Sequence, residues 1–193
     1  MSSRLRRLRR ALQREDVRSI SRRYFISNGF DGALTGVGVT VGSYLSGVPD
    51  GLTVFGIGVG AAIGLGTSGV WSVWEIERAE KRAEIKRIED AMLADLDETR
   101  IQREKAGARK VNAVMSGIGP VIGVVLPLLP FLFEGRLLSM RGATIASIAV
   151  AVAILFAFGA YLARISEQNW LVAGARMGLA GIVVAALTFL LPG

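Results

Sequence analysis

Three stretches of this sequence contain no charged residue at all: 51–74, 111–133 and 142–163. A helix needs about 20 consecutive apolar residues to cross the hydrocarbon core of a bilayer. Each stretch is long enough, and a soluble domain rarely places so many uncharged residues in a row. The sequence therefore predicts an integral membrane protein that is built from helices.

Two further stretches are each interrupted by a single charge. Residues 24–46 contain Asp31, and residues 168–193 contain Arg176. With these two, we expect an all-α membrane protein with five transmembrane helices. A Pro- and Gly-containing turn at 47–51 joins the first two spans as a tight hairpin.

The charges outside the spans predict orientation. Residues 1–23 hold nine arginines against two acidic residues, and residues 75–110 hold ten basic and ten acidic residues. Because basic segments stay in the cytoplasm, 1–23 forms a basic cytoplasmic N-terminal segment, and 75–110 forms a charged cytoplasmic helix between transmembrane helices 2 and 3. Residues 24–74 then hold helices 1–2, residues 111–193 hold helices 3–5, and the C-terminus lies outside. No organelle-targeting pattern is present, so we expect a prokaryotic cell membrane.

The N-terminal arginines are expected to contact anionic lipid, which attracts basic segments next to a membrane span. Nucleic acid is the weaker alternative, because no aromatic residues alternate with the arginines. We expect no nucleic-acid partner.

The chain has no cysteine and no histidine. This excludes disulfides, thiolate or imidazole metal sites, and Cys- or Ser–His-based nucleophiles. Any metal must be bound by oxygen ligands or methionine sulfur, and proton transfer falls to carboxylates. The protein is therefore not expected to be an enzyme.

Asp31 is the most informative residue. A carboxylate inside a membrane-spanning helix costs free energy, so it is by default a candidate for a functional role. Asn28 and Thr35 lie three residues before and four after it, on one face of a helix. Together they form a hard ligand set for a divalent cation, and Asp31 also suits proton coupling. The alternative is a structural ion pair with Arg176, which lies at a similar depth in the fifth span.

The charged stretch 75–110 is predicted to continue from the second span as a helix that ends near Gly107. Glu77, Glu80 and Glu84 fall on one face and could collect Fe²⁺ or Mn²⁺; the alternative is a solvated helix with internal ion pairs. Met115 in the third span is a candidate soft ligand, although such a methionine more often fills a core.

Glycine and proline residues are expected to determine how the helices pack and where they bend. Glycines recur four apart in several spans, which allows close helix packing and dimerisation; the pairs include Gly32/Gly36, Gly38/Gly42 and Gly119/Gly123. Three prolines in the third span are expected to kink or break it: Pro120, Pro127 and Pro130.

The residues Arg23-Tyr-Phe-Ile-Ser-Asn-Gly-Phe-Asp-Gly-Ala-Leu-Thr35 resemble the first span of the vacuolar iron transporter family. The Gly-rich second span that runs into an acidic helix is also similar, as are Leu126-Pro-Leu-Leu-Pro130 and Gly174-Ala-Arg-Met-Gly-Leu-Ala-Gly181. The likeness covers about residues 22–193. Two positions differ: Leu65 and Gly69 stand where the family commonly has a methionine and a glutamate.

The resemblance implies a homodimer of five-helix protomers that exports Fe²⁺ or Mn²⁺ from the cytoplasm, coupled to protons. The metal is then the transported ion, and no cofactor is permanently bound. Asp31 lines the path in this interpretation, and iron binding on the acidic helix falls on Glu77, Glu80 and Glu84.

A second hypothesis is a non-transporting membrane scaffold whose cytoplasmic helix docks a partner.

Overall fold

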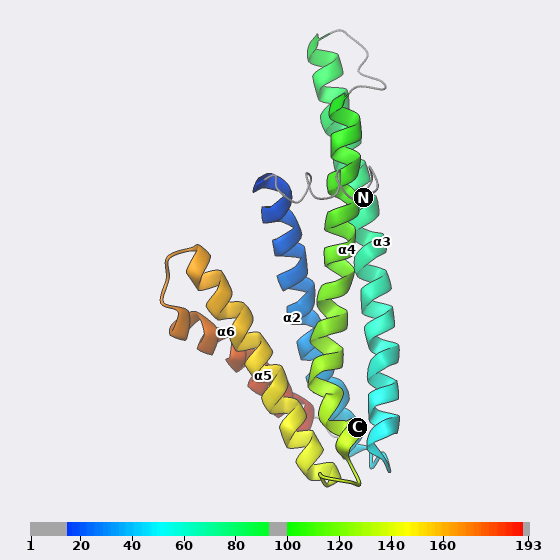
Figure 1. The fold of residues 1–193 in the computed structure, drawn as a ribbon, viewed down its shortest axis with the longest axis vertical. Coiled ribbons are helices and arrows are strands. Elements are labelled where there is room, and N and C mark those ends of the chain that lie inside the picture. The colour runs from blue at the N-terminus through cyan, green and yellow to red at the C-terminus, as the bar shows by residue number, and fades with distance from the viewer. Residues whose placement is uncertain (1–14, 93–99, 191–193) are drawn as a thin grey trace, which may run out of the picture.

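A computed structural model describes residues 15–92 and 100–190, which are helical apart from the connecting turns and one isolated bridge between Glu134 and Leu138 (Figure 1). The elements in chain order are α2 (Glu15–Leu45), α3 (Gly51–Met92), α4 (Arg100–Leu128), the 3₁₀ helix η1 (Leu129–Phe133), α5 (Met140–Ile165) and α6 (Trp170–Leu190). The all-helical prediction is confirmed for this part of the chain.

Four of the five α-helical elements are long and apolar enough to cross a membrane: α3, α4, α5 and α6. The helix α2 has the length to span but a less apolar composition, because it begins within the arginine-rich segment and carries Asp31 among serines and glycines. Its span over 24–46 remains a prediction. The described part of α2 begins at Glu15, so some of the basic segment belongs to this helix, whereas the arginines up to Arg14 lie outside the described residues.

The charged stretch between the second and third spans forms parts of two helices. The helix α3 continues without a break from the span to Met92, and α4 begins at Arg100. Gly107 lies inside α4, so the predicted helix end near Gly107 is wrong: a glycine costs only about 1 kcal/mol in a helix, and the buried neighbours that follow it in α4 outweigh that cost. Residues 93–99 lie outside the described residues. We call 75–92 and 100–110 together the charged extension (Figure 1).

Two of the three prolines in the third span do not break its helix, whereas the helix ends near the third as predicted. Pro120 and Pro127 both lie inside α4, which runs to Leu128. Only around Pro130 does the chain change to the 3₁₀ geometry of η1. Close packing against α2 covers the backbone near Pro120, which is how a proline is tolerated within a membrane helix.

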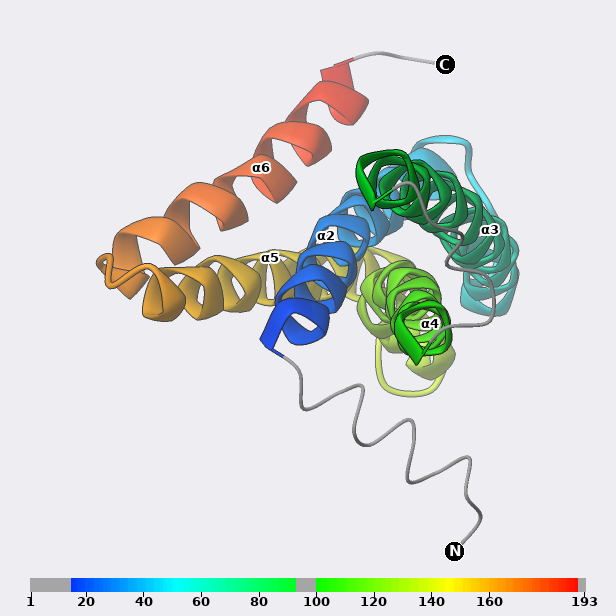
Figure 2. The ribbon, with the colours of Figure 1, turned by 90° about the horizontal axis from the view of Figure 1, so that it is seen from above.

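The helices form a three-helix group and a hairpin that leans against it. The helix α4 packs along α2 and α3, while α5 and α6 pack on each other and diverge from the group toward the end that carries the charged extension (Figure 1). Seen from above, α2 lies between α6 on one side and α3 with α4 on the other (Figure 2). Part of the α2 surface has no close neighbour among the described residues, since a Cβ added at Gly38 or Gly42 would meet no atom within 4 Å.

Glycine makes the contact between α2 and α4 possible. A Cβ atom added at Gly32 would lie 2.5 Å from the carbonyl oxygen of Pro120, and one at Gly123 would collide with the backbone of Gly29. The two backbones thus touch without an intervening side chain. This confirms the expected role of Gly32 and Gly123 in close packing.

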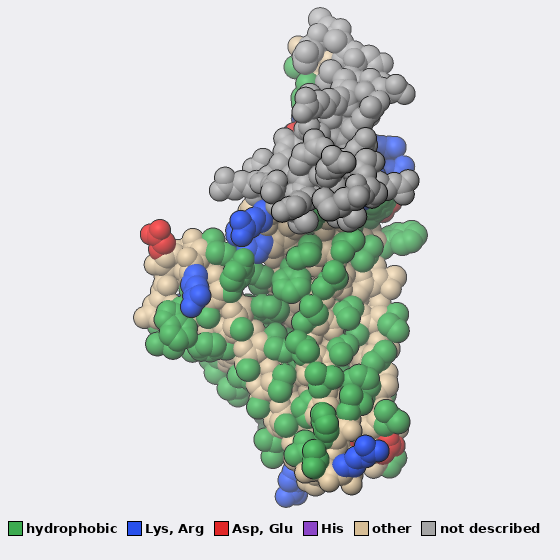
Figure 3. Space-filling model, viewed as in Figure 1, with side chains coloured by type: hydrophobic (Ala, Val, Ile, Leu, Met, Phe, Trp, Pro, Cys, Tyr) green, Lys and Arg blue, Asp and Glu red, His purple; other side chains and the backbone are tan. Residues whose placement is uncertain are grey.

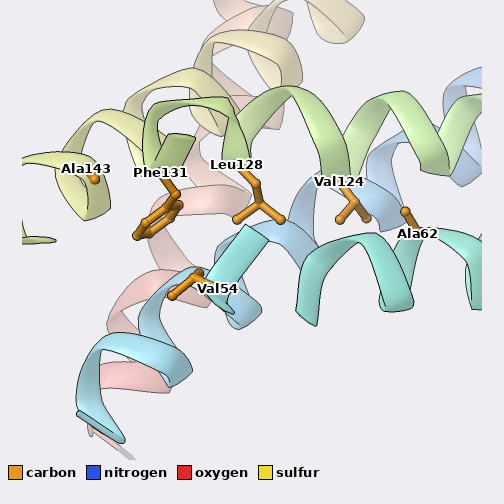
Figure 4. Packing of buried hydrophobic residues seen from close by; sticks show 6 residues of the cluster. All are labelled: Val54, Ala62, Val124, Leu128, Phe131 and Ala143. Atoms are coloured by element: carbon orange, nitrogen blue, oxygen red, sulfur yellow. The ribbon is translucent and has the colours of Figure 1, made fainter. Parts of the chain in front are cut away.

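A compact apolar cluster closes the other end of the bundle. It joins α3, α4, η1 and α5 through six buried residues (Figure 4): Val54, Ala62, Val124, Leu128, Phe131 and Ala143. At the start of α3, the Gly51 amide donates to Glu134 Oε2 at 3.2 Å. Asp50 accepts from the amide and the hydroxyl of Thr53, both at 2.8 Å, and these hydrogen bonds hold the pKa of Asp50 below its ordinary value.

The surface agrees with a bilayer location. Hydrophobic side chains cover the visible face, and the charged side chains gather toward its ends (Figure 3). A wide exposed apolar band of this kind is far larger than the patches of soluble monomers and indicates contact with lipid or another protein.

We predict that Gly32→Ala lowers the free energy of unfolding by about 1–3 kcal/mol, because its methyl group would force α2 and α4 apart. The matched control is Gly60→Ala on the exposed surface of α3, since no atom lies within 4 Å of a Cβ at that glycine. Its effect should stay within about 0.5 kcal/mol. Thermal unfolding of both purified variants in detergent measures the difference; equal stabilities would contradict the packing described for Gly32.

Candidate functional site

Asp31 lies on the outward surface of α2 and is exposed in the protomer. Thr35 follows one turn later, and its Oγ1 donates to the Asp31 backbone oxygen at 2.8 Å. Gly38 and Gly42 continue the same row along the helix, and a Cβ added at either would meet no atom within 4 Å. We call Asp31, Thr35, Gly38 and Gly42 the free face of α2. The structure thus brings Asp31 and Thr35 together on a surface that the described part of the protomer leaves uncovered.

Asn28 turns in another direction. It is half-buried, and its Nδ2 donates to the backbone oxygen of Ser116 at 3.1 Å and to the Ser116 hydroxyl. Its amide nitrogen therefore fastens α2 to α4. The predicted grouping of Asn28 with Asp31 and Thr35 gives way to this contact, because two hydrogen bonds to α4 fix the rotamer of Asn28.

Arg176 is exposed on α6. Among the described residues it forms no ion pair with Asp31. The contact between α6 and α2 lies further along both helices, where Val184 and Ala185 pack against Val37 and Val41. The alternative of a structural ion pair within one protomer therefore finds no support in the geometry.

Glu77 is buried, with only 4% of its surface exposed. Its Oε1 accepts from Asn112 Nδ2 at 2.9 Å, and its Oε2 lies 3.2 Å from Lys81 Nζ. Both oxygens of this carboxylate thus have partners within the protein. Glu80 and Glu84 are exposed, so the three glutamates do not present one common surface. No group of three or more acidic side chains that could hold a metal ion is found in the described ranges.

Polar groups continue from Glu77 into the three-helix group. Ser116 lies one turn from Asn112, and its hydroxyl donates to the Gly69 carbonyl at 2.9 Å while accepting from Asn28. We call Asn28, Gly69, Glu77, Asn112 and Ser116 the polar seam. It joins α2, α3 and α4 near the charged extension. One buried acceptor in it, Asn112 Oδ1, has no hydrogen-bond partner within the described part of the chain.

Sequence reasoning missed Asn112 and Ser116. The available signal was their spacing, since two polar residues four apart in an otherwise apolar span place their side chains on one face of a helix. Such a pair predicts an inward polar contact when the remaining surface faces lipid.

Gly69 explains one difference from the vacuolar iron transporter pattern. A Cβ atom at this position would lie 2.7 Å from the Ser116 backbone oxygen. The space that a glutamate would need is therefore filled by the backbone of α4. The neighbouring difference, Leu65, packs against the apolar cluster of Val54 and Leu128.

Met115 is half-buried and packs against Val17, Ala108 and Val111. These neighbours are apolar and offer no further ligand. The arrangement favours the core-filling interpretation of Met115.

A profile of the VIT family matches residues 73–192, from the last part of the second span to the end of α6. The chain belongs to the VIT family. This is a family of membrane metal-ion transporters, and membership confirms the resemblance that the motifs indicate. The chain is also 28% identical over 172 residues to an uncharacterized protein of Methanocaldococcus jannaschii, a match that covers 88% of this chain and 87% of that protein.

We predict that Glu77→Ala lowers the free energy of unfolding by roughly 2 kcal/mol, since it removes the ion pair with Lys81 and leaves the buried Asn112 amide without its acceptor. The matched control is Glu80→Ala, one turn away and exposed, with an expected change within about 0.5 kcal/mol. Thermal unfolding in detergent without added metal measures both. A Glu77 variant as stable as the Glu80 variant would contradict the structural role of this carboxylate.

Proposed function

We propose that this VIT-family protein exports Fe²⁺ or Mn²⁺ from the cytoplasm in exchange for protons, with Asp31 as the central ligand. The observation that carries this proposal is the exposed carboxylate of Asp31 on the free face of α2, within a segment that is otherwise uncharged from 24 to 46. A carboxylate left facing lipid costs at least about 2.5–3.5 kcal/mol at the bilayer centre. Water, a cation or a second protein surface must therefore meet it.

A second copy of the chain supplies that surface most simply. Interior glycines such as Gly32 are met by a neighbouring backbone, whereas a Cβ added at Gly38 or Gly42 would have nothing within 4 Å. Small residues that no neighbour uses within the protomer suit close contact with another helix. A twofold axis along the free face of α2 would bring two Asp31 carboxylates toward one another and make a homodimer.

Two facing carboxylates with the Thr35 hydroxyls and retained water form a suitable oxygen site for a hard divalent ion. Binding of the ion would displace protons from the carboxylates, which couples the two fluxes. Arg176 is exposed on α6 and forms no ion pair with Asp31 among the described residues, so its part in the path stays a prediction. Asn28 would support the path indirectly by holding α2 against α4.

The charged extension would provide a second site of metal binding, at which ions are collected before transport. Glu80 and Glu84 are exposed and would collect metal there, with the chain oriented so that this extension and the N-terminal arginines face the cytoplasm and anionic lipid. Glu77, held by Lys81 and Asn112, would serve to anchor α3 to α4.

One observation favours the alternative of a non-transporting scaffold. The glutamate position of the family's second span is occupied by Gly69, where α4 leaves no room for a side chain. A protein that had lost metal binding would keep the folded helices and use the charged extension to dock a partner. Metal flux distinguishes the two functions.

We predict that Asp31→Asn reduces Fe²⁺ or Mn²⁺ uptake into proteoliposomes by about tenfold or more, because the cation loses its charged ligand. The pH dependence of any remaining flux should disappear with the carboxylate. A metal-quenched dye inside the vesicles, with an imposed pH gradient, reports the flux. The control Glu167→Gln removes an exposed carboxylate from the turn between α5 and α6 and should leave the flux unchanged.

Unchanged flux and pH dependence in Asp31→Asn would refute the assigned mechanism. Absence of flux from folded wild-type protein with either metal would refute transport and leave the scaffold function.

We predict that Gly38→Cys forms an intermolecular disulfide under mild oxidation, which doubles the mass on a non-reducing gel. The natural chain has no cysteine, so a single introduced thiol reports one contact. The control Ile145→Cys places an even more accessible thiol on α5, outside the free face of α2, and should remain monomeric. Cross-linking of the control alone would place the dimer interface elsewhere.

A further inference from the structure

An open apolar groove of approximately 540 Å³ runs between α3 and α4 on the outer surface of the bundle. Gly66 and Gly117 form its floor, where the two helices approach so closely that a Cβ on Gly117 would lie 2.9 Å from the Gly66 carbonyl oxygen. Trp71, with 72% of its surface exposed, and Ile118 rise beside this floor as walls. The groove is thus a product of glycine packing, bordered by large side chains.

The groove has the length and direction of a lipid chain in one leaflet. Along α3 it extends from Ala62 to Trp71, which corresponds to about 14 Å at 1.5 Å per residue. Half of a hydrocarbon core of about 30 Å is roughly 15 Å. Because α3 and α4 are apolar enough to span the bilayer, the groove follows the direction in which acyl chains lie.

Cations gather at the end of the groove that is nearer the charged extension. Lys110 is exposed one turn before the groove residue Val114, and Arg78 is exposed two turns beyond Trp71. Arg78 pairs with Glu75 at 3.6 Å, but an exposed pair of this kind is weak and leaves the guanidinium available to another anion.

Arg109 adds an unsatisfied donor at the same end. Its guanidinium lies 4.1 Å from the ring centroid of Trp74, one turn beyond Trp71 on α3. Its Nε is buried and has no hydrogen-bond acceptor among the described residues. Arginine forms strong charge-assisted hydrogen bonds with phosphate and carboxylate oxygens, so a phosphate oxygen is a suitable acceptor here.

We propose that this groove binds one acyl chain of an anionic phospholipid, whose phosphate lies at Arg109, Lys110 and Arg78. An apolar groove of one-leaflet length with cations at one end matches the two parts of such a molecule. A free phosphate would leave the apolar part empty, and a second protein helix would not require the cations. The inference depends on the membrane location of α3 and α4 and is independent of metal transport.

Quenching of tryptophan fluorescence by brominated lipid tests this assignment. The chain has three tryptophans, so Trp170→Phe leaves Trp71 and Trp74 as reporters beside the groove. The full-length protein is reconstituted in phosphatidylcholine vesicles with rising fractions of brominated phosphatidylglycerol or brominated phosphatidylcholine. We expect half-maximal quenching at a clearly lower fraction of phosphatidylglycerol.

Charge-removing variants make the test specific. Lys110→Gln and Arg78→Gln should each reduce the preference for phosphatidylglycerol about fivefold. The control Arg164→Gln removes an exposed cation from the last turn of α5 and should leave the preference unchanged. Thr67→Phe, which fills the groove, should weaken quenching by both lipids.

Three outcomes would overturn the proposal. The first is equal quenching by both lipids, which removes the headgroup contact. The second is loss of the phosphatidylglycerol preference on addition of millimolar inorganic phosphate, which would assign the cations to a free anion. The third is protection of both tryptophans from quenching by either lipid, together with disulfide cross-linking of Ile118→Cys. This result would place a second copy of the chain in the groove.

Discussion

The close backbone contact between α2 and α4 determines what the rest of the molecule can do. Where Gly32 meets Pro120 and Gly123 meets Gly29, backbone fills the interior and no side chain separates the helices. A path for a hydrated ion through the middle of the protomer has no room at this level. A route across the membrane therefore cannot pass between α2 and α4 at this level, and the exposed Asp31 lies on another surface of α2. The two sides of α2 therefore differ, since one is closed by glycine packing and the other carries the exposed carboxylate of Asp31.

The polar seam has a different role, because it fixes the relative positions of helices that lack a strong hydrophobic drive to associate in lipid. Asn28, Ser116 and the Gly69 carbonyl join three helices at one level. Glu77 and Asn112 join α3 to α4 nearer the charged extension. Glu77 is buried but compensated by Lys81 and the Asn112 amide. Glu77, which its spacing in the sequence made a candidate metal ligand, thus joins α3 to α4 in the structure.

The sequence allowed the helical class and most helix positions to be predicted, because long uncharged stretches have few alternatives to a membrane helix. The site was harder to predict. Helical spacing places Asn28 near Asp31, but only the position of Ser116, 88 residues away, turns Asn28 toward α4. In the same way, the spacing of Glu77, Glu80 and Glu84 gives no sign that Asn112 buries the first of them. Contacts between distant segments, rather than local pattern, decide which polar residues remain available.

The unbroken course of α3 has a mechanical consequence. Its 42 residues correspond to a rod of about 63 Å, of which the last part projects into the charged extension. A rod of this length acts as a lever arm: a tilt of about 5° around its Gly51 end moves its Met92 end by roughly 5 Å. Any ligand or protein that pulls on Glu80 or Glu84 therefore exerts torque on the membrane-embedded half of the same helix. A force on the charged extension is therefore coupled, through the single helix α3, to the spacing of the helices within the bilayer.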